Sequence, residues 1–164
     1  MKVLVTGGSS LLGRAVADQL VGRGDRVTSF QRSPSAGPAD DALGDVRDRS
    51  AVLAAADGHD AIVHLAALVA PRPAWSDAYA VNVTGTRHVV EAAVRCGSLV
   101  HVSSPSVAFD GGPAVGAGVE PARYAGADAY TRSKAIAERF VLERAVGTTA
   151  RSRTNRSAMA FDRV

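Results

Sequence analysis

The stretch of sequence that decides the fold lies near the start of the chain and reads Val3-Leu4-Val5-Thr6-Gly7-Gly8-Ser9-Ser10-Leu11-Leu12-Gly13. Its first three apolar residues predict a buried strand, and apolar residues at helical spacing predict a helix over about 11–22. A glycine-rich turn between a strand and a helix is where backbone N–H groups and the helix N-terminus can hold a pyrophosphate. The turn therefore predicts a dinucleotide site, with a plain strand-to-helix turn as the alternative. The predicted site residues are Gly7, Ser9, Ser10, Leu11, Leu12 and Gly13.

Strand and helix signals alternate along the rest of the chain. Further strands are predicted over 27–30, 43–46, 61–65 and 99–103, and further helices over 48–56, 76–96 and 129–146. This alternation predicts an α/β fold, a doubly wound, Rossmann-like parallel sheet with helices on both faces. Residues 1–147 would form this single domain, in which 105–127 is a long connection rich in glycine and proline.

Composition places the chain among ordinary globular domains. Its 164 residues are 46% hydrophobic and 21% charged, which argues against a disordered chain. No apolar run approaches the ~18 residues that a membrane-spanning helix needs. The one cysteine, Cys96, cannot form an internal disulfide, so we expect a reducing compartment, the cytoplasm. We expect no metal site.

The last 17 residues differ from the rest of the chain. Residues 148–164 carry four arginines against one aspartate, which accounts for the whole net charge of +3. An excess charge confined to a tail does not indicate a nucleic-acid-binding face. The segment has neither strand nor helix periodicity, so we predict an irregular basic tail, an uncovered sheet edge at 99–103 and a fold incomplete at its C-terminal side. This abrupt change would suit a truncated gene or a shifted reading frame, and it predicts little or no turnover.

A tyrosine and a lysine four residues apart lie on the last predicted helix, in Tyr130-Thr131-Arg132-Ser133-Lys134. At that spacing the two side chains share one helix face. A phenol with a pKa of about 10 is a poor base near neutral pH, but a neighbouring ammonium stabilises the phenolate. The pair predicts a tyrosine acid–base, although the spacing also arises by chance. A third polar group is expected at the end of a strand, where the chain reads Val102-Ser103-Ser104-Pro105-Ser106-Val107, with turn-forming serines as the alternative.

In this order, over about 1–145, the motifs resemble those of extended short-chain dehydrogenases/reductases. The glycine-rich stretch is similar to the family's TGGxGxxG fingerprint, with Ser10 in place of the middle glycine. The resemblance implies that Ser104 hydrogen-bonds the substrate oxygen beside Tyr130 and Lys134. It also implies that Asp45 accepts a hydrogen bond from the adenine amino group. Other residues that it places along the cofactor, or in a relay near the active site, are Val46, Leu65, Ala66, Ala67 and Asn82.

The choice of nicotinamide cofactor depends on the end of the second predicted strand, which reads Phe30-Gln31-Arg32-Ser33. An acid there binds the adenosine ribose of NAD, whereas an arginine accommodates the 2′-phosphate of NADP. Gln31 offers no carboxylate and Arg32 can bind phosphate, so we predict NADP, with NAD as the alternative. A solvated Arg32 without a ligand is the other interpretation. We expect His64, on the fourth strand, to be a core histidine with satisfied hydrogen bonds.

Within the family, VSSPSV, Ala74-Trp75 and the Tyr130–Lys134 motif are most similar to the 3β-hydroxysteroid dehydrogenase-like branch. The resemblance implies hydride transfer between a secondary alcohol or ketone, sterol-like, and a nicotinamide cofactor. Two alternatives stay open, a sugar-nucleotide epimerase or dehydratase and a truncated, non-catalytic NADP-binding protein. The expected partners are a small-molecule substrate and a second copy of the chain, paired through helices 76–96 and 129–146, with no nucleic acid and no membrane span.

Overall fold

The computed structural model describes residues 1–108, 128–146, 151–155 and 158–162. These residues contain one sheet with the strand order β3-β2-β1-β4-β5-β7-β6. The first five strands are parallel to their neighbours. They are β1 (Lys2–Thr6), β2 (Arg26–Gln31), β3 (Asp40–Leu43), β4 (Ala61–His64) and β5 (Ser98–His101).

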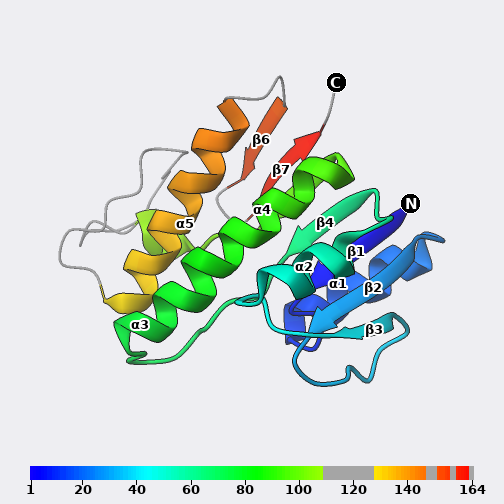
Figure 1. Ribbon diagram of the computed structural model, residues 1–164, viewed down its shortest axis with the longest axis horizontal. Coiled ribbons are helices and arrows are strands. Elements are labelled where there is room, and N and C mark those ends of the chain that lie inside the picture. The colour runs from blue at the N-terminus through cyan, green and yellow to red at the C-terminus, as the bar shows by residue number, and fades with distance from the viewer. Residues whose placement is uncertain (109–127, 147–150, 156–157, 163–164) are drawn as a thin grey trace.

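Helices cover both faces of the parallel strands (Figure 1). On one face, Ala17 of α1 (Leu11–Gly22) packs with alternate residues of β1 and β2. On the other face, α2 (Arg49–Ala56), α4 (Gly85–Cys96) and α5 (Ala129–Val146) cover a core that includes Leu4, Ile62 and Leu99. Because successive residues of a strand point to opposite faces, each central strand contributes to both cores. The predicted doubly wound α/β sheet is confirmed.

The helix predicted over 76–96 is continuous but not uniform. It begins as α3 (Trp75–Ala78), passes through a π-helical segment η1 (Tyr79–Thr84) and continues as α4. Gly97, with φ at 95°, ends it in the left-handed conformation that glycine adopts without strain. No apolar period distinguishes a π-helical turn from an α-helical one, so the sequence did not predict η1.

The third strand lies three residues earlier than the predicted 43–46. β3 runs over Asp40–Leu43 and pairs with β2 from Thr28 to Gln31. Three of its four residues are exposed, so β3 carries no buried apolar pattern from which its position could be read. Asp45 and Val46 therefore follow the strand instead of belonging to it.

The prediction of an irregular tail and an uncovered β5 edge is wrong. Arg151–Asn155 (β6) and Ala158–Asp162 (β7) form an antiparallel pair, and β7 lies antiparallel to β5 with Leu99 opposite Phe161. An outer strand is held by backbone hydrogen bonds, so it needs no long apolar run. The glycine-rich connection after the short 3₁₀ turn η2 (Pro105–Ala108) falls mostly on 109–127, outside the described residues.

Candidate cofactor and catalytic site

The glycine-rich turn leaves β1 at the carboxyl end of the sheet and has no room for side chains at two positions. Gly7 has φ at 76°, and a Cβ there would lie 2.9 Å from the backbone nitrogen of Ala66. A Cβ on Gly13 would lie 2.7 Å from the Cα of Gly8 and would also collide with the carbonyl oxygen of Gly7. Both positions require glycine because the neighbouring atoms belong to the backbone, which cannot move aside as a flexible side chain can.

Ser10, at the position of a fingerprint glycine, is the N-cap of α1. Its φ is −70°, so a side chain there causes no strain. The Ser10 hydroxyl accepts a hydrogen bond from the Gly13 backbone N–H at 3.0 Å and donates one to the Gly7 carbonyl at 2.8 Å. The following Leu11 and Leu12 are exposed, and their backbone N–H groups, in the first helical turn, have no intrahelical acceptor. The turn thus keeps backbone donors at a helix N-terminus, where an anion is stabilised.

The segment after β4 lies directly against this turn. Thr6 accepts from the backbone N–H of Leu65 through its carbonyl, at 3.1 Å, and from that of Ala66 through its hydroxyl, at 3.2 Å. The structure therefore brings Leu65 and Ala66 next to Gly7, and Ala67 follows them directly in the chain. Their contact with a cofactor stays a prediction.

The adenine-side residues divide between the surface and the core. Asp45 accepts hydrogen bonds from the guanidinium and the backbone N–H of Arg47, and this pairing lowers the pKa of the Asp45 carboxyl below its usual value. Both carboxylate oxygens are thus already engaged, so an adenine amino group would have to compete with Arg47. Val46 lies 7% exposed in the core, beside Gly85 of α4, and not on an open surface. Arg32 is exposed.

Lys134 is the most unusual charged residue of the site. Its side chain lies in the interior, 4% exposed, and its Nζ donates a hydrogen bond to the backbone carbonyl of Val102, 2.7 Å away at the end of β5. Burial lowers the pKa of the Lys134 ammonium to about 8, and the nearby Glu138 carboxylate opposes part of that change. The contact holds the middle of α5 against the strand end that leads to Ser104.

The two serines after β5 have different partners. The buried Ser103 hydroxyl donates to the carboxylate of Glu138, one turn beyond Lys134 on α5. The Ser104 hydroxyl instead bonds the hydroxyl of Ser106 at 2.9 Å. Ser103 is therefore a structural link between strand and helix, and Ser104 lies beside it with a partner from the adjoining turn.

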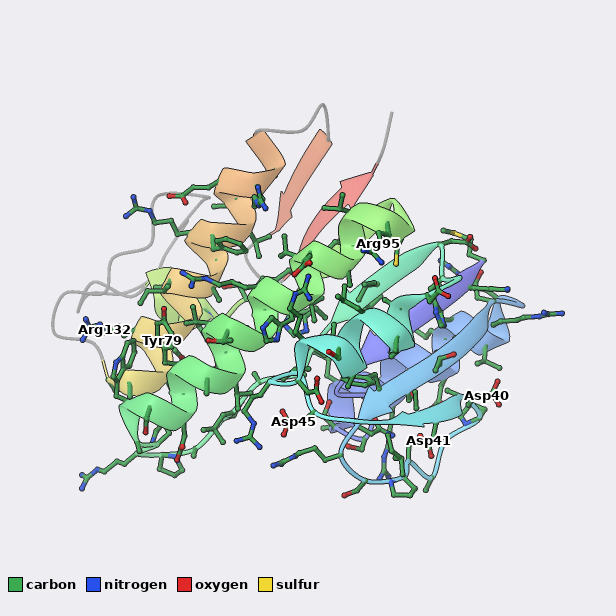
Figure 2. All side chains as sticks on the ribbon, viewed as in Figure 1. Asp40, Asp41, Asp45, Tyr79, Arg95 and Arg132 are labelled. Carbon is green, nitrogen blue, oxygen red and sulfur yellow. The ribbon has the colours of Figure 1, made fainter. Side chains whose placement is uncertain are left out.

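Tyr130 lies in the first turn of α5 and is partly buried. Asp128 caps this helix by accepting from the Thr131 backbone N–H and hydroxyl, both at 3.0 Å, and these bonds lower the pKa of the Asp128 carboxyl. Arg132 places its guanidinium 4.5 Å from the centre of the Trp75 ring. Figure 2 shows Arg132 and Tyr79 close together where α3 meets α5. These contacts fix the helix start that carries Tyr130, although no hydrogen bond among the described residues joins Tyr130 to Ser104.

Asn82 connects the two halves of the site from within η1. Its side-chain oxygen accepts from the Leu68 backbone N–H at 2.7 Å, and its amide nitrogen donates to the Leu68 carbonyl at 3.2 Å and to the Ser133 hydroxyl at 2.8 Å. Ser133 in turn donates to the carbonyl of Tyr130. Asn82 thus positions the segment after β4 and the start of α5, and its predicted part in a relay stays a prediction.

Sequence reasoning missed Ser133 and Glu138 as supporting residues. Glu138 is 3% exposed, and it follows Lys134 by one helical turn on the same face. An acid four residues after the motif lysine, on a face that also carries the apolar Val141, is the signal that could have identified it.

His64 is the core histidine that the sequence analysis expected. Its Nδ1 lies 2.6 Å from the Thr6 hydroxyl and its Nε2 lies 3.0 Å from the Thr86 hydroxyl. Burial lowers the pKa of His64 to about 3. The His101 ring, with its centre 5.3 Å from that of His64, is fully buried, and neither of its nitrogens has a hydrogen-bond partner in the part of the chain that the structure describes.

Other kinds of site find no support in the described residues. They contain no cluster of three or more side chains suited to a metal ion, and none of their helices combines the length and apolar character needed to cross a bilayer.

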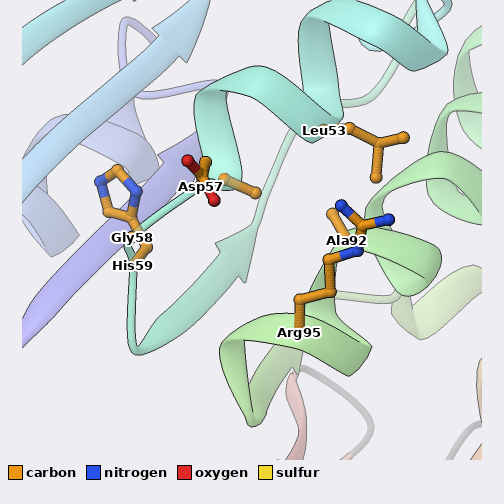
Figure 3. Close-up of a pocket in the computed structure, with 7 residues that line it drawn as sticks. Leu53, Asp57, Gly58, His59, Ala92 and Arg95 are labelled. Carbon is orange, nitrogen blue, oxygen red and sulfur yellow. The ribbon is translucent and has the colours of Figure 1, made fainter.

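A small cavity of about 130 Å³ lies between the ends of α2 and α4, lined in part by Leu53, Asp57, His59 and Arg95 (Figure 3). It adjoins the amino end of β4, whereas the glycine-rich turn and Lys134 lie at the carboxyl ends of the strands.

A parallel sheet with a glycine-rich turn after β1 and polar side chains at its carboxyl edge defines the class of dinucleotide-binding α/β proteins. A family model described as the 3-beta hydroxysteroid dehydrogenase/isomerase family matches residues 4–155. The chain belongs to this family.

Individual relatives agree with that assignment. The chain is 39% identical over 156 residues to 3 beta-hydroxysteroid dehydrogenase/Delta 5-->4-isomerase of Mycobacterium tuberculosis, a match covering 86% of this chain and 42% of that protein. It is 38% identical over 152 residues to 2-alkyl-3-oxoalkanoate reductase of Stenotrophomonas maltophilia, covering 87% and 46%. The chain therefore spans less than half the length of these curated relatives.

Solved structures give the same fold. A short-chain dehydrogenase/reductase superfamily protein from Agrobacterium tumefaciens, solved with bound NAD, is similar with a TM-score of 0.74 and 29% identity. The match covers 88% of this chain and 45% of that one. MoeE5, solved with UDP-glucose and NAD, has a TM-score of 0.75 and 29% identity, covering 87% and 48%.

Proposed function

We propose that the chain forms the cofactor-binding part of an NAD(P)-dependent oxidoreductase that moves hydride between a secondary alcohol or ketone and a nicotinamide. The observation that carries this proposal is the buried Lys134 ammonium, bonded to Val102 at the end of β5. Burying a charged amine costs free energy, so a buried lysine beside polar groups at the carboxyl edge of a sheet is a candidate functional residue. Lys134 follows Tyr130 by one helical turn, and the carbonyl that it bonds belongs to Val102, two residues before Ser104.

The residues present fit a nicotinamide dinucleotide. The cradle at Gly7 and Gly13 admits no side chain, and the buried Gln31 carries a side-chain oxygen without a hydrogen-bond partner near that turn. The turn, Arg32, Asp45 and residues 65–67 would hold the cofactor, and a bound nicotinamide would supply or accept hydride. Since β2 ends without a carboxylate and is followed by the exposed Arg32, we propose a preference for NADP over NAD.

The chain's own residues then have distinct tasks. The Tyr130 hydroxyl takes the proton from a substrate alcohol, or returns it to a ketone oxygen, and the Lys134 ammonium stabilises the phenolate form. The Ser104 hydroxyl leaves Ser106 and hydrogen-bonds the same substrate oxygen. Ser103, Asn82 and Glu138 hold these groups in place without touching the substrate.

Relatives and solved structures suggest two substrate classes. The named activity of the Mycobacterium tuberculosis relative favours a hydroxysteroid, whereas MoeE5 was solved with a sugar nucleotide. We favour the sterol-like alcohol because the matching family model points the same way.

Helices 76–96 and 129–146 are proposed to pair two copies of the chain, and the cytoplasm is its proposed compartment.

The test begins with binding. Titration with NADPH and NADH, followed by nicotinamide fluorescence, is expected to show binding of both with NADPH tighter, and Arg32→Ala should remove most of that preference. Absence of binding to either cofactor would overturn the proposal.

Turnover is tested next with a 3β-hydroxysteroid and with UDP-glucose. Where turnover is present, Tyr130→Phe should lower it by a factor of ~10² or more and leave cofactor affinity unchanged. Binding without turnover of any alcohol would favour the non-catalytic alternative, and a response to UDP-glucose alone would favour the epimerase or dehydratase alternative. Near-normal turnover in Tyr130→Phe would contradict the mechanism.

A further inference from the structure

Gln31, at the end of β2, is held from the neighbouring strand by a carboxylate. The amide nitrogen of Gln31 donates to the Asp41 carboxylate on β3 at 2.7 Å. Asp41 also accepts from the Ser35 hydroxyl at 2.8 Å and from the Ser35 backbone N–H at 2.9 Å. Asp41 lies opposite Ser29 in the parallel ladder, so it projects from the same face of the sheet as Ser29 and Gln31. Figure 2 shows it on β3 at the edge of the sheet.

This contact fixes the orientation of the Gln31 amide. A carboxylate only accepts hydrogen bonds, so the atom facing Asp41 must be the amide nitrogen, and the carbonyl oxygen must face the other way. That oxygen is buried and has no hydrogen-bond partner, and it would lie 3.0 Å from a Cβ placed on Gly8. It is therefore an acceptor aimed at the glycine-rich turn and still lacking a donor. A buried acceptor left unpaired is costly, so a ligand that brings a donor to this point gains affinity.

We propose that Asp41 is a specificity-determining residue for the cofactor, because it holds Gln31 with its carbonyl oxygen toward the glycine-rich turn. This inference rests on the cofactor site of the proposed function. In that orientation Gln31 accepts a hydrogen bond from an adenosine-ribose hydroxyl. The 2′-hydroxyl of NAD can donate such a bond, whereas the 2′-phosphate of NADP, which bears only acceptor oxygens at neutral pH, cannot.

Asp41 and Arg32 therefore act in opposite directions. Arg32 attracts a 2′-phosphate, while the Gln31 carbonyl and the Asp41 carboxylate favour a ribose hydroxyl. In a NAD site the acid at the end of β2 binds the ribose directly. Here the acid is Asp41 on β3, and it acts on the ribose through the Gln31 amide that it holds. Asp41 therefore limits the preference for NADPH that Arg32 confers, and loss of Asp41 should increase that preference.

The experiment measures dissociation constants for NADH and NADPH by nicotinamide fluorescence on the full chain. In Asp41→Ala, Gln31 can turn its amide nitrogen toward the phosphate, so the preference for NADPH over NADH should rise roughly fivefold relative to wild type. Asp40→Ala is the matched control, because it removes the same charge from the adjacent exposed position of β3, where no contact with Gln31 is made. Asp40→Ala should leave the preference within about twofold.

A second background separates specificity from general damage. In Gln31→Met the orphaned acceptor is gone, so adding Asp41→Ala should no longer change the preference. A fall in affinity for both cofactors by the same factor in Asp41→Ala would overturn the inference and leave the proposed function standing. An equal response of Asp40→Ala and Asp41→Ala would also overturn it, since charge alone would then explain the effect. Loss of all binding in the wild-type chain would instead refute the proposed cofactor site.

Discussion

The side-chain amide of Asn82 donates a hydrogen bond to the hydroxyl of Ser133, 2.8 Å away, across the boundary between η1 and α5. The same side chain holds both backbone polar groups of Leu68. One asparagine therefore couples the segment that follows β4 to the helix carrying Tyr130 and Lys134. A substitution at Asn82 should therefore disturb both the segment after β4 and the start of α5.

Replacing Asn82 by alanine is expected to destabilise the fold more than replacing Ser133. Asn82→Ala leaves the Leu68 N–H, the Leu68 carbonyl and the Ser133 hydroxyl short of partners, which should lower the free energy of unfolding by roughly 2–4 kcal/mol. Ser133→Ala removes the hydrogen bond from Asn82 and the hydrogen bond to the Tyr130 carbonyl, and it should cost about 1–2 kcal/mol. Urea unfolding at an unchanged m-value measures both, and equal losses would show that the Leu68 contacts contribute nothing.

Two glycines of the same region make a sharp comparison. Gly13→Ala forces a Cβ against the backbone of Gly7 and Gly8, so it should weaken NADPH binding and lower the free energy of unfolding by about 1–3 kcal/mol. Gly22→Ala, at the other end of α1, meets nothing within 4 Å and should raise stability by about 0.5–1 kcal/mol. Denaturant unfolding and a cofactor titration distinguish them. A Gly13→Ala variant with wild-type affinity would contradict the described cradle.

The two buried histidines predict sensitivity to acid. His64 binds a proton only at about pH 3 in the fold, and burial together with the Lys134 charge also holds the pKa of His101 well below its ordinary value. In the unfolded chain both titrate near 6.5, so below that pH the unfolded state binds more protons and the free energy of unfolding falls as the pH is lowered. His64→Gln should flatten this slope between pH 6.5 and 3.

His101 should be replaceable with a gain in stability. Both of its ring nitrogens are buried without a partner among the described residues, and Leu has a similar volume. His101→Leu is therefore expected to raise the free energy of unfolding at pH 7 by roughly 1 kcal/mol or more. The matched change His64→Leu breaks two hydrogen bonds and should destabilise instead. If both variants lose stability alike, His101 has a partner that these contacts do not include.

Lys134 predicts a dependence of the same sign at alkaline pH, because its pKa is also lower in the fold than in the unfolded chain. Its pKa is about 8 in the fold and near 10.5 in the unfolded chain, so between these values the unfolded state binds the extra proton. The free energy of unfolding should therefore increase from pH 8 to 10.5 in the wild type relative to Lys134→Met. Lys2→Met, at the other lysine of the chain, which is exposed, serves as the control. Parallel pH curves for wild type and Lys134→Met would show that the ammonium is solvated.

The turn after β1 could be predicted from sequence because its demands are local. Gly7 needs a positive φ and Gly13 a close approach, and both are set within a few residues of chain. The bonds from Ser103 to Glu138 and from Asn82 to Leu68 could not be predicted in the same way. They join residues that are distant in sequence. Each bond depends on the position at which a helix packs along the strands, which no local pattern specifies.

The outer strands were the least predictable part of the fold. β3 was placed three residues late, because its exposed residues give no alternation to read. β6 and β7 were missed because arginines and short apolar runs do not resemble a buried strand, although backbone pairing alone can hold an outer one.

The addition of β7 and β6 moves the edge of the sheet from apolar to basic sequence. Without them the last strand would be Ser98–His101, which contains Leu99 and Val100. With them the outermost strand among the described residues is β6, in which two of five residues are arginines. Charged residues on an outermost strand oppose edge-to-edge stacking of one molecule on the next. Arg151 and Arg153 therefore place two of the chain's positive charges in this outer strand.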